Sequence, residues 1–141
     1  MKLRLSIAAL FLFTFFSCTD KKEKYVDFLN EKLETDYSHY TGKYEYIAII
    51  PRRGCNACIR EAESFFNKKK SDEKYLFLFT QISSKKELEL SIGKENLKLE
   101  NVLIDSSNIF YLFEQEDSQY PLLLKKEPTG KYSYTKLTSS N

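Results

Sequence analysis

Two cysteines, Cys55 and Cys58, stand three residues apart, and Pro51-Arg-Arg-Gly54 separates them from the β-branched run Ile47-Ala-Ile-Ile50. Pro51 removes a backbone donor where this run ends, and Gly54 gives the chain freedom to turn. Beyond the thiols, buried-type residues recur at helical spacing at Ala62, Phe65 and Phe66. The sequence therefore predicts a buried strand, a tight turn and a helix whose first turn carries both thiols.

The position at the start of a helix makes one of the two thiols reactive. Free N–H groups and the positive end of the helix dipole stabilise a thiolate at Cys55, and the neighbouring charges of Arg52 and Arg53 should act in the same direction. Cys58 lies one turn deeper and within disulfide reach. Thiol–disulfide exchange needs one thiolate that attacks and a second thiol that resolves the mixed disulfide, and this pattern supplies both.

Composition narrows the class of protein. The chain has 141 residues, enough for one domain, with ordinary hydrophobic and charged fractions. Its net charge is +2, and without Lys2 and Arg4 the 22 basic residues become 20, which equals the number of acidic residues. The balance gives no reason to expect a nucleic acid as partner. One histidine, His39, and two cysteines do not fill a zinc site, so we expect no metal and no cofactor.

The N-terminal residues 1–17 are predicted to form an export signal, because a short basic start precedes an apolar run that is too short to span a bilayer comfortably. Ser17-Cys18 resembles the cleavage site of bacterial lipoproteins, so Cys18 is the expected lipidation site and residues 18–24 a tether. An ordinary buried Cys18 is the alternative. Lipidation would leave two thiols, the even number that an exported redox pair requires.

Residues 25–141 form the expected domain. A helix is predicted from Tyr25 to Leu33, followed by a polar loop that holds His39 on the surface. The later elements follow from apolar runs, a capping box at Ser84 and a Pro-x-Gly turn at 127–130. They are strands at 75–82, 101–105, 120–124 and 132–137, and helices at 84–92 and 108–114. At 108–114 the period of the apolar residues also fits a strand, which is the alternative there.

The order of these elements resembles the thioredoxin fold, an α/β fold with a central mixed sheet flanked by helices. More narrowly, the chain from about Tyr44 to Leu137 is similar to membrane-anchored, extracytoplasmic thioredoxin-like proteins that handle disulfides. The resemblance implies that Cys55 attacks, Cys58 resolves and Glu61 relays a proton near the pair. It implies that Pro121 is a cis proline beside the disulfide.

Gly54, Tyr120 and Arg53 are the expected contacts to the partner chain, and plain surface charges are the alternative for Arg52 and Arg53. From the residues alone, a solvated carboxylate remains the alternative for Glu61, and a trans proline that opens an edge strand is the alternative for Pro121.

The chain departs from the thioredoxin pattern in three places. Gly54 stands where a tryptophan commonly precedes the first cysteine, and Ile49 stands where thioredoxin has a buried aspartate. Only residues 138–141 follow the last predicted strand, so the usual C-terminal helix has no counterpart. Part of one sheet face should then lie open or be covered by the helix at 25–33.

These features favour a lipid-anchored thiol–disulfide oxidoreductase in the cell envelope, facing the periplasm or the cell exterior. Its expected partners are exported cysteine-containing proteins, an unknown redox partner and the membrane. Reductase, oxidase and isomerase remain open. The alternative is a non-catalytic thioredoxin-like binding or structural lipoprotein in which Cys55–Cys58 is a permanent disulfide. A copper-handling thioredoxin-like protein fits less well, because His39 lies upstream of the thiols.

Overall fold

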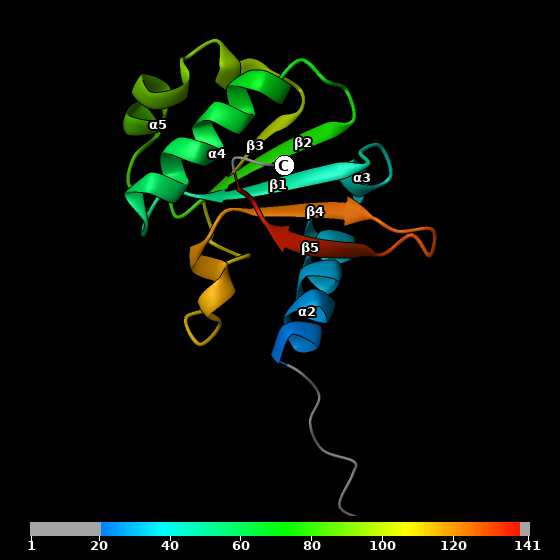
Figure 1. Ribbon diagram of the computed structural model, residues 1–141. Helices are drawn as coiled ribbons and strands as arrows, with labels where there is room; N and C mark the ends of the chain where they lie inside the picture. The colour runs from blue at the N-terminus through cyan, green and yellow to red at the C-terminus, as the bar shows by residue number, and fades with distance from the viewer. Residues whose placement is uncertain (1–20, 139–141) are drawn as a thin grey trace, which may run out of the picture.

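The computed structural model describes residues 21–138, which form a five-stranded mixed sheet flanked by helices (Figure 1). The strand order is β3-β2-β1-β4-β5, with β1, β2 and β3 parallel and with β4 and β5 antiparallel to their neighbours. The strands are β1 (Tyr46–Pro51), β2 (Tyr75–Thr80), β3 (Val102–Asp105), β4 (Leu122–Lys126) and β5 (Tyr132–Lys136). The α/β class and the thioredoxin-like arrangement predicted from the sequence are confirmed.

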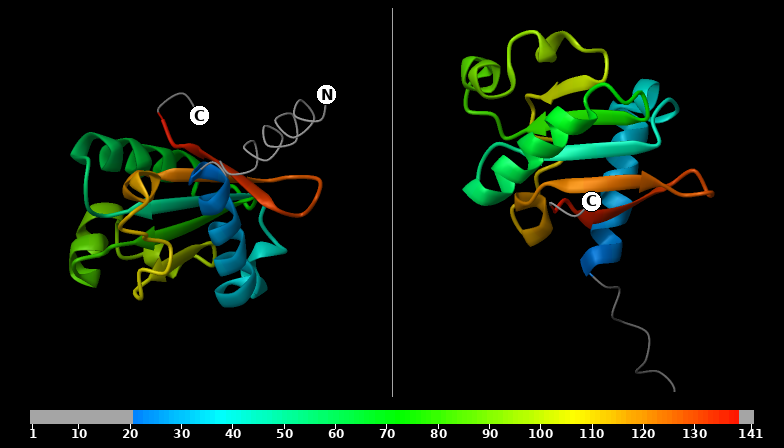
Figure 2. Two further views of the ribbon diagram at one scale, coloured as in Figure 1. Left: turned by 90° about the horizontal axis from the view of Figure 1, so that it is seen from below. Right: turned by 45° about the horizontal axis from the view of Figure 1, so that its top comes forward.

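Helices lie on both faces of the sheet, as Figure 2 shows. The α-helices are α2 (Lys21–Asp36), α3 (Ser38–Thr41), α4 (Asn56–Lys69) and α5 (Lys85–Ile92). Two short 3-10 helices, η2 (Asn96–Lys98) and η3 (Glu116–Gln119), lie in the later connections. None of the helices between residues 21 and 138 is long and apolar enough to cross a bilayer. The expected signal segment and Cys18 lie outside the described residues.

The period-2 alternation of the strands divides the core into two layers. On β1, Ile47 and Ile49 face α2, whereas Ala48 and Ile50 face α4 and α5. Every residue of β2 is buried, which explains its continuous apolar sequence. The turn that carries the two cysteines follows directly from β1, one of these buried central strands.

The N-terminal helix is longer than the sequence predicted. It begins at Lys21, so residues 21–24 of the expected tether belong to its first turn. The predicted polar loop after it contains the short helix α3, and His39 is exposed there as expected. The described domain therefore begins three residues after Cys18 in the sequence.

Asn30 joins α2 to the edge strand β5. This buried side chain accepts a hydrogen bond from the Tyr132 N–H at 2.7 Å and donates one to the Tyr132 carbonyl at 2.9 Å. The amide thus occupies the position that another strand would take at the sheet edge, which keeps part of this edge from pairing with a second chain.

Asn30→Ala should lower the free energy of unfolding by about 2–4 kcal/mol, because two buried backbone groups of Tyr132 lose their partner. Urea denaturation followed by circular dichroism measures the change. Asn67→Ala is the matched control, since Asn67 is exposed on α4, and its effect should stay within about 0.5 kcal/mol. Equal midpoints for the two variants would show that Asn30 does not hold β5.

The helix predicted at 108–114 is wrong. Asn108 has a positive φ of 55°, outside the right-handed helical region. Asp105, at the end of β3, fixes the turn that follows: its carboxylate accepts from the Ile109 N–H at 3.0 Å and the Phe110 N–H at 3.3 Å. The Phe110 carbonyl accepts from the Tyr25 hydroxyl of α2 at 3.2 Å. The segment is therefore a series of turns that buries Phe110.

One part of the sheet is left without a covering helix. Within residues 21–138 no helix follows β5, and α2 packs on the face opposite α4. On the α4 side of β5, Ser133 and Thr135 are exposed. Of the two outcomes expected for the sheet face, an open region is the one found on this side within residues 21–138.

Candidate functional site

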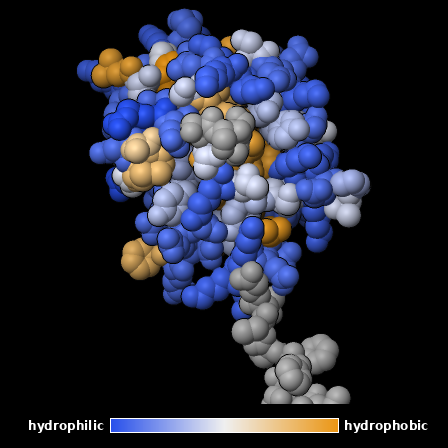
Figure 3. Space-filling model, in the orientation of Figure 1, coloured by the Kyte–Doolittle hydropathy of each residue, from blue (hydrophilic) through white to orange (hydrophobic). Residues whose placement is uncertain are grey.

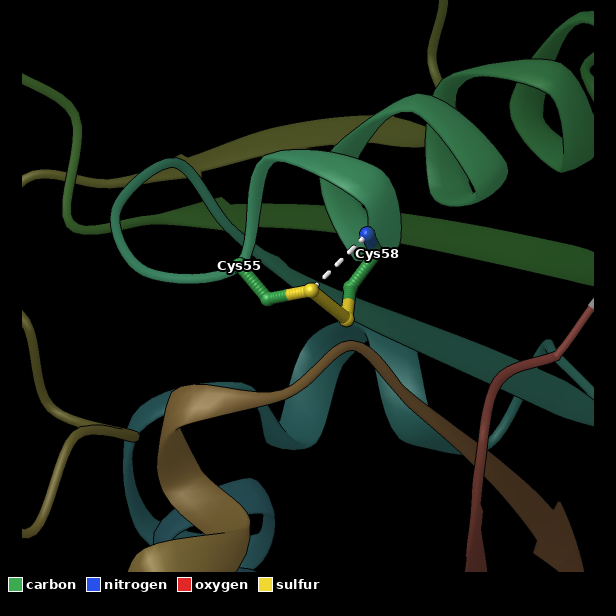
Figure 4. Close-up of a disulfide and its surroundings, with 2 residues drawn as sticks. All are labelled: Cys55 and Cys58. Carbon is green, nitrogen blue, oxygen red and sulfur yellow. Dashed lines mark hydrogen bonds between the residues drawn. A yellow bond between two sulfur atoms is a disulfide. The ribbon is translucent and has the colours of Figure 1, made fainter.

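The predicted thiol pair forms a disulfide at the start of α4 (Figure 4). The Cα atoms of Cys55 and Cys58 are 5.2 Å apart. Cys55 is the N-cap residue and is exposed to solvent, whereas Cys58 lies in the first turn and is half-buried. A thiolate from another protein can therefore approach the sulfur of Cys55 more easily than that of Cys58.

The helix start donates a hydrogen bond to the exposed sulfur. The Cys58 N–H lies 3.2 Å from Cys55 Sγ, the contact drawn as a dashed line in Figure 4. An N-cap side chain commonly accepts such a bond from the third helical residue. When the disulfide is open, the same donor and the helix dipole stabilise a negative sulfur at Cys55 more than a neutral one. A disulfide with CxxC spacing in this position is compatible with a redox function.

Gly54 shapes the turn that precedes the disulfide. Its φ is +107°, a conformation that residues with a side chain rarely adopt. A Cβ at this position would also lie 3.2 Å from the Gln119 carbonyl oxygen. Gly54 thus permits both the turn and the close approach of the end of η3. The sequence predicted the turn at Gly54, but no sequence pattern indicated that Gln119 lies against it.

The Tyr120–Pro121 peptide bond is trans, because the structure contains no cis bond in residues 21–138. The cis proline implied by the resemblance is therefore wrong. Pro121 is nonetheless buried at the start of β4, and its carbonyl accepts a hydrogen bond from the Leu137 N–H at 2.8 Å. Extending the β1–β4 register places Pro121 opposite Ile50 and Pro51 opposite Tyr120. Two residues without an N–H thus end the ladder beside the disulfide turn.

A polar network holds the segment that leads into Pro121. Asp117, in η3, accepts a hydrogen bond from the Tyr134 hydroxyl at 2.6 Å and forms an ion pair with Lys136 at 2.9 Å. The Lys136 ammonium also lies 4.2 Å from the centre of the Tyr120 ring. Tyr120, an expected partner contact, is therefore positioned by β5. Sequence reasoning missed this network, although the alternation of β5 already placed Tyr134 and Lys136 on one face.

The network changes the ionisation of its members. Burial by itself raises the pKa of Asp117, but hydrogen bonds from Tyr134 and Lys136 outweigh it and hold the pKa below the ordinary aspartate value. The hydrogen bond to Asp117 raises the pKa of Lys136. Both groups are consequently charged at neutral pH.

Asp117→Asn should lower the free energy of unfolding at neutral pH by about 1–2 kcal/mol, because a charge-assisted hydrogen bond and an ion pair are weakened. The folded-state pKa of Asp117 is lower than its unfolded value, so its stabilisation exists above the unfolded pKa and disappears as the pH falls through the folded one. The difference between parent and variant should therefore shrink below about pH 4. Urea midpoints across acidic pH test this, and a difference that persists at the lowest pH would contradict it.

The two arginines before the turn differ in their surroundings. Arg52 forms an ion pair with Glu63 at 2.6 Å and donates to the Ser91 hydroxyl at 3.0 Å, and its side chain is only 10% exposed. Its charge is thus matched by a carboxylate and its role is to tie the end of β1 to α4 and α5. The expected help from Arg52 to the Cys55 thiolate is weakened accordingly. Arg53 is exposed beside Gly54, where a partner chain could contact it.

Glu61 lies one turn beyond Cys58 and is exposed, at the edge of a shallow pocket that it shares with Arg60, Ser64 and Lys68. This exposure favours the solvated carboxylate over a buried proton relay. In the part of the chain that the structure describes, no three His, Cys, Asp or Glu side chains gather as a metal site would require.

The chain matches no protein-family model, no curated protein and no solved structure. A function is therefore inferred from the geometry of the disulfide and its surroundings.

Proposed function

We propose that this protein is a lipid-anchored thiol–disulfide oxidoreductase of the cell envelope that exchanges disulfides with exported proteins through Cys55 and Cys58. The observation that carries the proposal is the exposed N-cap sulfur of Cys55, which accepts a hydrogen bond from the Cys58 N–H at 3.2 Å. This contact stabilises the negative sulfur that must form whenever the disulfide opens. The anchor is proposed at Cys18, on the sequence pattern described above.

In the oxidising direction, a thiolate of the exported protein attacks Cys55 Sγ. The Cys55–Cys58 bond breaks, a mixed disulfide forms and Cys58 leaves as a thiolate. A second thiolate of the exported protein then attacks its own half of the mixed disulfide and releases Cys55 as a thiolate. Two electrons have moved from the exported protein to the cysteine pair, and a separate redox partner must remove them.

In the reducing direction, the Cys55 thiolate attacks a disulfide of the exported protein and releases one of its sulfurs as a thiolate. Cys58, as a thiolate, then attacks Cys55 Sγ and releases the second sulfur. The cysteine pair is now oxidised and the exported protein carries two thiols. The same atoms serve both directions, so the potential of the pair relative to its redox partner decides which one operates.

The reduction potential of the pair separates exchange from a structural role. Equilibration of the full chain with glutathione buffers, read by alkylation and mass spectrometry, should give a value between about −270 and −120 mV, the range of exchange-active pairs. A potential below about −300 mV is typical of structural disulfides and would support the non-catalytic alternative. The measurement does not involve the anchor, so it tests the redox half of the proposal alone.

The anchor has its own test. In a bacterial host, the chain should incorporate labelled fatty acid and sediment with membranes, and Cys18→Ser should remove the label. Label that persists in Cys18→Ser, or none in the parent chain, would contradict lipidation at this position.

A further inference from the structure

Phe113 is the most exposed large hydrophobic residue in the described part of the chain, at 82%. Its loop is nevertheless well held: the Ser118 hydroxyl lies 2.7 Å from the carbonyls of both Leu112 and Gln115, and the Gln115 N–H donates to the Leu112 carbonyl at 3.0 Å. Leu112 itself packs against the core beneath α2. The fold therefore presents the Phe113 ring to the outside from a fixed backbone.

The ring lies next to the first turn of α2. Lys21 and Lys24, both exposed, line one hollow together with Leu112, Phe113, Glu114 and Gln115. We call the surface formed by Lys21, Lys24, Leu112 and Phe113 the Phe113 face. The side of the molecule shown in Figure 3 is mostly hydrophilic, with hydrophobic groups that stand apart from one another. An aromatic ring beside lysines is the arrangement that suits the boundary between lipid headgroups and acyl chains.

The distance to the proposed anchor brings this face to the membrane. Cys18 precedes Lys21 by three residues, and three fully extended residues span at most about 10–11 Å. A lipid on Cys18 would therefore hold the first turn of α2 within that distance of the bilayer surface. The headgroup layer is itself several Å deep. Because the Phe113 face adjoins this turn, it would also lie near the bilayer surface.

We propose that the Phe113 face rests on the lipid bilayer, with the Phe113 ring at the level where headgroups meet acyl chains. This proposal relies on the anchor of the proposed function but not on its redox chemistry. The two lysines favour anionic headgroups, although Glu114 in the same hollow offsets one of the two charges. The ring is therefore the principal contact.

The loop that carries Phe113 is also linked to the disulfide turn. It continues directly into η3, and the Gln119 carbonyl at the end of η3 lies against the Gly54 turn that precedes the disulfide.

The absence of tryptophan from the sequence allows a direct test. Phe113→Trp in the full chain introduces a single indole at an exposed position, so the fold should tolerate it. The protein is bound to vesicles of phosphatidylcholine with a minority of phosphatidylglycerol, made with or without brominated acyl chains. Flotation of the same sample gives the bound fraction, and indole fluorescence gives the depth.

Leu90→Trp is the matched control. Leu90 is 80% exposed on α5, which lies at the far end of the domain from the start of α2 in Figures 1 and 2. Quenching by brominated lipid should be about threefold stronger for Phe113→Trp, with a blue-shifted emission, because only that ring reaches the acyl boundary.

Equal quenching of the two variants in floated protein would overturn the proposed orientation while leaving the anchor intact. Failure of the chain to float at all would contradict both the anchor and the orientation. Thiol–disulfide exchange does not enter either readout, so its presence or absence leaves this result unchanged.

Discussion

Cys55→Ser should reduce the rate of thiol–disulfide exchange with a cysteine-containing protein to that of the uncatalysed reaction. The variant removes the exposed sulfur that accepts attack in one direction and performs it in the other. Cys58 cannot replace it, because its sulfur is half-buried and does not occupy the N-cap. The rate is measured with a peptide disulfide whose reduction changes its fluorescence, with glutathione as the second thiol.

The Cys58→Ser variant tests the second step of the exchange, the resolution of the mixed disulfide. It keeps the backbone N–H that donates to Cys55 Sγ but cannot resolve a mixed disulfide. Exported proteins should therefore accumulate in covalent complexes with this variant that disappear on reduction, while Cys55→Ser forms none. Absence of complexes from both variants under oxidising conditions would indicate that the disulfide is structural.

Asp105→Ala should lower the free energy of unfolding by about 3–5 kcal/mol, the largest stability effect that we expect from a single polar residue. The Asp105 carboxylate is 1% exposed and accepts hydrogen bonds from the Thr80 hydroxyl and from two backbone N–H groups of the following turn. Removal of the carboxylate leaves three donors without a partner in the core, and each such group is costly.

Urea denaturation tests this prediction, with Asp27→Ala as a control because Asp27 is exposed on α2. The control should change stability by no more than about 0.5 kcal/mol. Asp105→Asn should lie between the two, since an amide retains one oxygen acceptor. A midpoint for Asp105→Ala equal to that of Asp27→Ala would show that the loop after β3 does not depend on this side chain.

The parts of the fold that were predictable are those in which local pattern and burial agree. The strand before the thiols, the helix capped by Ser84 and the hairpin near Gly130 each follow from residues within one short window. Gly93, predicted to stop α5, has a φ of +92° and lies at its end. In these segments the chain needs no distant contact to choose its conformation.

The wrong predictions share a different cause. The apolar residues at 108–114 fit a helix or a strand by period, but the folded chain buries Phe110 and its carbonyl accepts a hydrogen bond from the Tyr25 hydroxyl of α2. Contacts with a distant helix therefore decided the conformation of this segment. Arg52 was likewise expected to stabilise the Cys55 thiolate, but its charge is paired with Glu63 of α4, which no local pattern links to it.

The candidate site was only partly predictable for the same reason. Both cysteines and Gly54 could be identified because their roles are set by the helix start itself. The contact between Gly54 and Gln119 depends on the pairing of β1 with β4, and the ion pair of Asp117 with Lys136 depends on the pairing of β4 with β5. Such contacts form between residues that are distant in sequence, and no local sequence pattern predicts them.

The most direct test of the central claim is the pKa of the Cys55 thiol in the reduced protein. It is measured from the pH dependence of alkylation in Cys58→Ser, which leaves Cys55 as the reacting thiol of the site. Because the sulfur occupies the helix N-cap and accepts the N–H of residue 58, we expect a pKa below about 7.5, whereas a free cysteine titrates near 8.5. A value at or above about 8.5 would contradict thiolate stabilisation by the helix and, with it, the proposed exchange chemistry.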